Sequence, residues 1–296
     1  MEVIKSCPIC NNPEYSHFIS CKDYTVSRET FSIVRCDKCG FLFTNPRPDI
    51  SHIGEYYKSE DYVSHSNTSK GLINKLYKGV RKYTLGRKLK LINSLSAKGI
   101  VLDIGCGTGE FLYTCKSAGW RTLGVEPDAG ARKFGAENYG LDVKEESSLS
   151  TLPSGNYDII TMWHVLEHVY NLKDRVNELK RLLKESGRII VAVPNSSSLD
   201  ASYYKESWAA YDVPRHLYHF RPQDIERLFG DSGMKVEKVM PMKFDSYYVS
   251  MLSEKYTSGK PNLIKALLKG FASNRSASSD ERSYSSQIYI IKKVNS

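Results

Sequence analysis

The stretch with the clearest chemical meaning is 99–112, which reads Gly-Ile-Val-Leu-Asp-Ile-Gly-Cys-Gly-Thr-Gly-Glu-Phe-Leu. An apolar run ends in Asp103, alternating glycines follow, and a helical pattern then begins. This order predicts a buried strand, a tight turn and a helix N-terminus, where backbone amides can approach a ligand. Because Glu110 replaces the last glycine of a pyrophosphate-binding loop, the pattern favours a nucleoside cofactor without phosphate. Asp103 could face a cationic ammonium group.

A second carboxylate follows the next predicted strand, 121–126. That strand ends in Glu126, 19 residues after Gly107. A carboxylate at this position can accept hydrogen bonds from both hydroxyls of a ribose. The alternative is an ordinary strand, turn and helix with solvated acidic residues.

The segment 103–109 resembles the first motif of class I S-adenosylmethionine-dependent methyltransferases. The resemblance implies an α/β fold, a doubly wound and mostly parallel seven-stranded sheet, with S-adenosylmethionine as cofactor. Glu145 or Glu146 is a weaker candidate for the edge of the adenine. The cofactor-binding residues that we expect are Asp103, Gly105, Cys106, Gly107, Gly109, Glu126 and Glu146.

Two Cys-x-x-Cys pairs, Cys7 with Cys10 and Cys36 with Cys39, make a zinc-ribbon pattern near the N-terminus. Either pair alone could be a redox motif, but two pairs supply four thiolates for a tetrahedral zinc ion. Four thiolates leave no open position, so we expect a structural zinc. Cysteines used in this way indicate a reducing compartment, and we expect a cytoplasmic protein.

His164, Glu167 and His168 lie just after the predicted fourth strand, at the sheet edge where ligands of open α/β sheets bind. The segment resembles the motif after this strand in small-molecule methyltransferases. In the ubiquinone-biosynthetic O-methyltransferases a Glu-x-x-Glu-His set binds a divalent ion. Here His164 replaces the first Glu, so a second metal stays an open question. Glu167 and His168 could instead anchor the helix by hydrogen bonds, while His164 contacts the substrate.

His216 lies in an aromatic segment, 195–221, that follows the predicted fifth strand. This segment resembles the Tyr-x-Glu-His-x-x-Tyr-Phe segment of zinc-ribbon sugar C-methyltransferases, whose histidine serves as base. Arg215 stands where those enzymes have Glu. The resemblance makes His216, or else His164, the expected base in methyl transfer, and the insert would cover the cofactor's methyl group. His216 and His219 could alternatively be core residues.

The elements that must position these residues alternate between strand and helix from residue 100 onward, which is typical of a doubly wound sheet. We expect three parts: a zinc ribbon at 1–48, a helical linker or lid at 49–98, and a methyltransferase domain at 99–296 with the insert 195–221. The apolar spacing over 72–95 predicts one long amphipathic helix or two short ones. The segment 246–271 is expected to be helical.

The net charge of +9 is unevenly distributed, because 70–98 contains nine Lys or Arg and no acidic residue. We call 70–98 the basic stripe. Such a stripe can attract nucleic acid, anionic lipid or phosphorylated substrates, or it can be a solvated helix face. No run of 18 apolar residues is present.

These features favour a methyltransferase that O-methylates a small hydroxylated substrate, such as a sugar or a glycolipid precursor. Peripheral contact with an anionic membrane surface is an expected partner interaction. Two alternatives remain: an RNA methyltransferase that uses the zinc ribbon and the basic stripe, and a non-catalytic scaffold of the same fold.

Overall fold

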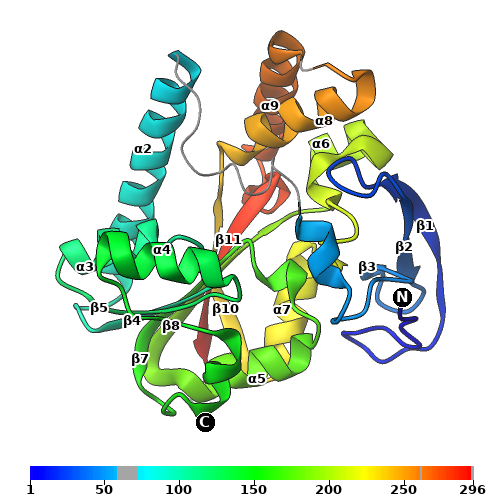
Figure 1. Cartoon of the computed structure of the whole chain (residues 1–296). Coiled ribbons are helices and arrows are strands. Elements are labelled where there is room, and N and C mark those ends of the chain that lie inside the picture. The colour runs from blue at the N-terminus through cyan, green and yellow to red at the C-terminus, as the bar shows by residue number, and fades with distance from the viewer. Residues whose placement is uncertain (59–71, 261, 295–296) are drawn as a thin grey trace.

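A computed structural model describes residues 1–58, 72–260 and 262–294, with the side chains of 72–78 outside the description. Figure 1 shows a large central sheet with helices on both faces and a smaller sheet at the N-terminal side. Part of the predicted linker 49–98 and the first lysines of the basic stripe therefore lie outside the described residues.

The central sheet has seven strands in the order β10-β11-β8-β7-β4-β5-β6. All of its pairings are parallel except those of β11, which runs antiparallel to both β8 and β10. This arrangement confirms the predicted fold class. Its strands are β4 (Ile100–Ile104), β5 (Arg121–Val125), β6 (Val143–Lys144), β7 (Tyr157–Trp163), β8 (Leu183–Pro194), β10 (Met234–Pro241) and β11 (Ser286–Lys293).

Helices cover both faces of this sheet because the buried strand residues alternate between the faces. On one face Leu102 packs with α5 (Leu172–Leu182) and α7 (Pro222–Gly230) in one cluster of buried side chains. On the other face Val101 packs with α2 (Leu72–Leu95) and α3 (Glu110–Ser117). The helix α4 (Ala129–Tyr139) follows β5. The sequence predicted either one long helix or two short helices over 72–95, and the structure has a single helix there.

The smaller sheet has the order β1-β2-β3-β9 and joins the N-terminal segment to the insert. It consists of β1 (Tyr15–Lys22), β2 (Thr30–Cys36), β3 (Leu42–Thr44) and β9 (Tyr218–His219). Leu42 of β3 pairs with His219 of β9, and the Thr44 hydroxyl donates to the backbone carbonyl of His216 at 2.8 Å. The predicted boundaries at 48 and 98 stay a prediction, but the N-terminal sheet is completed by a strand of the insert.

Two helices occupy the segment where one helical stretch was expected, and both lie beside the insert. They are α8 (Asp245–Ser258) and α9 (Leu263–Ala277), and Gly259 ends α8 with a positive φ of 75°. The insert itself begins with α6 (Leu199–Tyr204). Short 3-10 helices include η1 (Ile53–Tyr57), η2 (Glu146–Thr151), η3 (Leu166–His168), η4 (Lys205–Ser207), η5 (Ala209–Tyr211) and η6 (Glu281–Ser283).

Candidate active site

The glycine turn connects the end of β4 to the first residue of α3. Gly105 and Gly109 have positive φ values of 70° and 85°, and a Cβ on Gly105 would lie 2.4 Å from a methyl carbon of Val165. At Gly107, also with positive φ, a Cβ would meet no described atom within 4 Å. The backbone of this loop is therefore packed on one side and open at Gly107, as a site for a bound cofactor requires.

Glu126 reaches the open part of the glycine turn from the end of β5. Its Oε2 accepts the backbone N–H of Gly107 at 2.9 Å, and its Oε1 accepts the N–H of Asp128 at 3.0 Å. Burial raises the pKa of Glu126, although both amides favour the charged form. Each carboxylate oxygen can accept a further hydrogen bond, so the pair of ribose hydroxyls predicted from the sequence would find acceptors here.

Asp103 lies at the end of β4 and is almost fully buried. The hydroxyl of Thr161 donates to it at 2.5 Å, but burial dominates and raises the pKa of Asp103 to about 7. Lys88 of α2 opposes this rise, and its Nζ lies 4.0 Å from the centroid of the Trp163 ring. Lys88 therefore belongs to the site and not to a solvated helix face. No pattern in the sequence singles out Lys88, which is one of the nine cations of the basic stripe.

Glu146, the weaker candidate for the adenine, begins η2. Its carboxylate accepts a hydrogen bond from Arg175 of α5 at 2.5 Å and is about half exposed. Glu145 accepts a hydrogen bond from the hydroxyl of Ser147. Both carboxylates thus have protein partners, and a contact of either with adenine stays a prediction.

His164 follows the last residue of β7 and has a positive φ of 56°, a strained value for a residue with a side chain. Its Nε2 lies 3.2 Å from Asp245, the first residue of α8, and its Nδ1 lies 3.5 Å from Glu167. Burial disfavours the charged ring, but the two carboxylates outweigh it and raise the pKa of His164 to about 10. His164 is therefore protonated at neutral pH, which suits a hydrogen-bond donor better than a base.

His216 is held in one tautomer by its own loop. Its Nδ1 lies 2.8 Å from the carbonyl oxygen of Ala210, and because a carbonyl only accepts, Nδ1 carries the proton. The lone pair of His216 is thus on Nε2, which lies 4.0 Å from both Glu167 and Asp212. This arrangement matches a base whose protonated form two carboxylates would stabilise.

Glu167 is fully buried, and neither of its carboxylate oxygens has a hydrogen-bond partner among the described residues. Its neighbour His168 is held through Nδ1 by the carbonyl of Arg215 at 3.0 Å and the hydroxyl of Tyr57 at 2.9 Å. Burial and the neighbouring His216 lower the pKa of His168 to about 4, so this ring is neutral. Hydrogen bonds therefore anchor His168 but not the side chain of Glu167.

One ligand atom from each of Glu167, His168 and His216 lies within 4.8 Å of the others. Among the described residues this is a set that could hold a divalent cation, and it does not contain His164. His219 behaves differently: it is buried, contacts Thr44 at 3.1 Å, and burial holds its pKa well below the usual value. His219 is thus a core residue.

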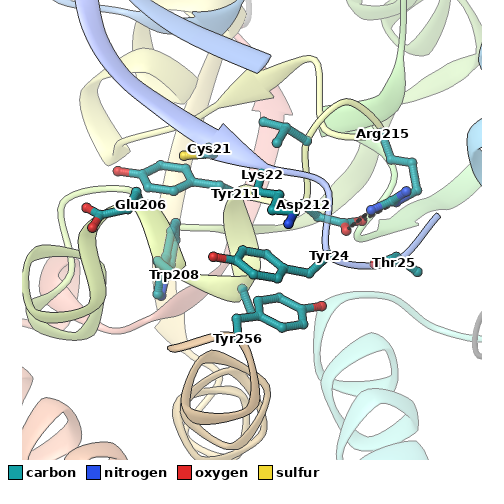
Figure 2. A pocket seen from close by; sticks show the side chains of 12 residues that line it. Cys21, Lys22, Tyr24, Thr25, Glu206, Trp208, Tyr211, Asp212, Arg215 and Tyr256 are labelled. Atoms are coloured by element: carbon teal, nitrogen blue, oxygen red, sulfur yellow. Dashed lines mark hydrogen bonds and ion pairs between the residues drawn. The ribbon is translucent and has the colours of Figure 1, made fainter. Parts of the chain in front are cut away.

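Arg215, which stands where the resembling enzymes have Glu, joins the insert to the N-terminal segment. Its guanidinium is 1% exposed and binds Asp212 at 2.6 Å and Asp23 at 3.0 Å. Figure 2 shows this group at one side of a pocket between β1 and the insert, with Tyr24 and Tyr256 stacked at 4.4 Å. The pocket contains no residue of the glycine turn. Arg215 therefore fixes the position of Asp212 beside His216.

Most of the aromatic residues expected to cover the cofactor's methyl group have packing partners elsewhere. The indole N–H of Trp208 donates to Asp200 at 2.8 Å, and the hydroxyl of Tyr204 donates to Glu254 at 3.0 Å. Both belong to a buried cluster that also contains Phe31 of β2 and Tyr211. These side chains connect the insert to the smaller sheet and α8, and their role above the methyl group stays a prediction.

A comparison with family models decides the family. The model described as a methyltransferase domain matches residues 77–239, more than half of the chain. The chain belongs to the class I S-adenosylmethionine-dependent methyltransferases.

Related proteins fit this membership. A ubiquinone biosynthesis O-methyltransferase of Rhodopseudomonas palustris is 29% identical over 161 residues, covering 51% of this chain and 63% of the relative. The methyltransferase spans about half to two thirds of the length of such curated relatives.

Solved structures share the fold. A SAM-dependent methyltransferase from Archaeoglobus fulgidus superposes with a TM-score of 0.52 at 22% identity, covering 75% of this chain and 98% of that one. Phosphoethanolamine N-methyltransferase 2 of Haemonchus contortus, solved with S-adenosyl-L-methionine, gives a TM-score of 0.52 at 15% identity, over 72% and 53% of the two chains.

The four predicted zinc ligands of this methyltransferase come together as expected. The Sγ atoms of Cys7 and Cys39 lie 3.6 Å apart, and those of Cys10 and Cys36 lie 3.5 Å apart. One sulfur from each of the four lies within 4.8 Å of the others. Zinc–sulfur bonds of ~2.3 Å in a tetrahedron would place sulfurs about 3.8 Å apart, so the cluster has the size that zinc requires.

In the described part of the chain, no helix combines the length and the apolar character that a membrane span needs.

Proposed function

We propose that this methyltransferase transfers the methyl group of S-adenosylmethionine to a hydroxyl group of a small acceptor, such as a sugar or a glycolipid precursor. The observation that carries the proposal is the tautomer of His216. With Nδ1–H held by Ala210, its Nε2 is free to take a proton. An oxygen nucleophile needs such a base, because a hydroxyl group becomes a strong nucleophile only as its proton leaves.

The cofactor would be held by the residues at the carboxyl ends of β4 and β5. The glycine turn is open at Gly107, Glu126 offers two acceptor oxygens to the ribose, and Asp103 offers a carboxylate to the amino group. A bound cationic ammonium would favour the charged form of Asp103, whose pKa burial otherwise raises to about 7. When bound, the sulfonium supplies an electrophilic methyl group.

His216 would act as the base in the insert. As the acceptor hydroxyl attacks, its proton passes to Nε2 of His216, and the positive charge that forms on the ring is stabilised by Glu167 and Asp212, each 4.0 Å away. Asp212 is kept ionised by Arg215: burial works against the charge, but Arg215 lowers the pKa of Asp212 overall. A negative charge on Asp212 is therefore already in place when the His216 ring becomes positive.

His164 would orient the acceptor. Its ring is about one third exposed, and the contact of its Nδ1 with Glu167 is long at 3.5 Å, so the Nδ1–H could be shared with an acceptor oxygen while Nε2 stays paired with Asp245. An acceptor bound between His164 and His216 would exclude water, which would otherwise compete for the hydrogen bonds of these two rings.

We also propose that Cys7, Cys10, Cys36 and Cys39 hold a structural zinc ion, which requires a reducing compartment such as the cytoplasm. The zinc would act on catalysis only indirectly. The segment that it closes continues into β3, which pairs with β9 next to His216.

The proposal is tested by incubating the purified protein with S-adenosylmethionine and a panel of sugars, nucleotide sugars and glycolipids, and measuring S-adenosylhomocysteine formation. We expect turnover with a hydroxylated member of the panel, and loss of that turnover in His216→Ala. Methyl transfer to RNA but to no panel member would instead support the RNA methyltransferase alternative. Cofactor binding without transfer to either would support a scaffold.

A further inference from the structure

The helix α9 presents its large apolar side chains to solvent. Five residues, each 54–75% exposed, form this surface: Leu263, Ile264, Leu267, Leu268 and Phe271. We call them the apolar face of α9. Their spacing places them on one side of the helix, where they are neighbours. Contiguous exposed apolar surface of this kind marks an interaction site.

The opposite side of α9 is buried and consists of small residues, namely Ala266, Gly270, Ser273 and Ala277. A Cβ at Gly270 would lie 2.7 Å from the ring of Tyr247 in α8, so the close contact between these helices requires a small residue here. The Ser273 hydroxyl also donates to the buried Asp200 at 2.7 Å. The orientation of α9 is therefore fixed by packing, and turning its apolar face inward would break these contacts.

The segment that carries this face is basic. Between residues 255 and 279 the sequence contains five basic residues and no acidic one. Lys265 lies 3.1 Å from Glu254 of α8, and Lys269 lies 3.6 Å from the centre of the Tyr203 ring of α6, so both lysines occupy the flank of α9 between the apolar face and the neighbouring helices. A helix with large apolar residues on one face and lysines along its flanks is typical of helices that lie in the interface of an anionic bilayer.

We propose that the apolar face of α9 docks on an anionic membrane surface. In Figure 1 α8 and α9 lie at the same end of the molecule as α2, and Tyr83 of α2 contacts Phe244 edge to face at 5.7 Å. A second copy of this chain is the other natural occupant of an apolar face. A symmetric pairing would bring two copies of this basic segment together, and the repulsion between like charges opposes association.

The helix α8, against which α9 packs, contacts the candidate active site and the insert directly. Asp245, which begins α8, pairs with His164, and Glu254 near the end of α8 accepts a hydrogen bond from Tyr204 of the insert. Docking would hold the site close to the headgroups, where a lipid-linked acceptor would be found. The docking proposal itself does not depend on the acceptor or on turnover.

The test is co-sedimentation of the full chain with sucrose-loaded vesicles of phosphatidylcholine alone or of phosphatidylcholine with phosphatidylglycerol. We expect binding to the anionic vesicles, little binding to the neutral ones, and loss of binding as salt rises. In Ile264→Ser/Leu268→Ser the partition coefficient should fall by roughly tenfold or more, because two large apolar side chains no longer enter the interface. Ile50→Ser, at a residue 73% exposed outside α9, is the matched control and should bind like the unaltered protein.

A second variant keeps the proposal testable if the serine variant misfolds. Lys260→Glu/Arg275→Glu changes two exposed cations and should also lose binding to anionic vesicles. Titration with S-adenosylmethionine verifies that each variant is folded. Equal binding to neutral and anionic vesicles, or no binding at all, would overturn the proposal. So would a concentration-dependent dimer that Ile264→Ser/Leu268→Ser converts to monomer, because the face would then belong to a second copy.

Discussion

The carboxylate of Glu126 accepts a hydrogen bond from the backbone N–H of Gly107 at 2.9 Å, which joins the ends of β5 and β4 at the open point of the glycine turn. The same carboxylate accepts the N–H of Asp128. Glu126 thus fixes the loop conformation and at the same time offers its remaining lone pairs to a ligand. Both functions depend on its negative charge.

Glu126→Ala should lower the affinity for S-adenosylmethionine by roughly tenfold to a hundredfold, since hydrogen bonds to a charged group contribute about 1.5–3 kcal/mol. Isothermal titration calorimetry measures this directly. Glu137→Ala, which removes an exposed carboxylate of α4, is the matched control and should leave the affinity unchanged. An unaltered affinity in Glu126→Ala would remove Glu126 from the cofactor site.

Cys36→Ser should release the zinc ion and unfold the N-terminal sheet while cofactor binding persists. Elemental analysis should find about one zinc per chain in the unaltered protein, because four thiolates complete one tetrahedral site. Cys21→Ser is the control, since Cys21 is buried but lies outside the cluster of four. An ordered N-terminal segment in metal-free protein, seen as resistance to limited proteolysis, would contradict this prediction.

Because of His164, the free energy of unfolding should fall as the pH rises into the alkaline range. The folded pKa of His164, about 10, lies above the ordinary value of 6.5, so its contribution is complete below pH 6.5 and is lost as the pH rises toward 10. Because the side chain is 35% exposed, solvent screens the pairs and we expect about 1 kcal/mol. Urea unfolding at the two ends of this range should show a larger decline in the unaltered protein than in His164→Gln. Equal declines would mean that His164 is not charged in the native state.

The parts of this molecule that could be predicted from the sequence are those that local patterns encode. The strand before Asp103, the glycine turn and the carboxylate of Glu126 follow one another along the chain, and parallel strands bring their ends to one edge. The two cysteine pairs likewise carry their spacing in the sequence. For these features, the local sequence pattern is enough to predict which residues lie together in the structure.

The contacts that could not be predicted join distant segments without a local pattern. His164 forms an ion pair with Asp245 at the start of α8, and Arg215 forms one with Asp23, which follows β1. The Nζ of Lys88 lies 4.0 Å from the centroid of the Trp163 ring, whereas the sequence presents Lys88 as one cation of a stripe that could bind anions or be a solvated helix face. The sequence predicts helical structure over 246–271, but only the packing of the small residues of α9 against α8 determines that its large apolar residues face outward.

His216→Ala should lower turnover by about 10²–10⁴, the usual range for the loss of a general base, with little change in cofactor affinity. The reason is that Nε2 of His216 carries the free lone pair, whereas His164 is already protonated at neutral pH. His164→Ala should therefore act differently and chiefly raise the Michaelis constant of the acceptor. Steady-state kinetics with the acceptor found in the panel separate the two effects.

The control for this comparison is His17→Ala, which removes an exposed histidine of β1 whose ring contacts Ser20. This substitution should alter neither the turnover number nor the Michaelis constant of the acceptor. If His216→Ala kept full turnover while His164→Ala abolished it, the roles of the two histidines would be reversed, and His164 would have to lose its proton to Asp245 or Glu167 before each transfer.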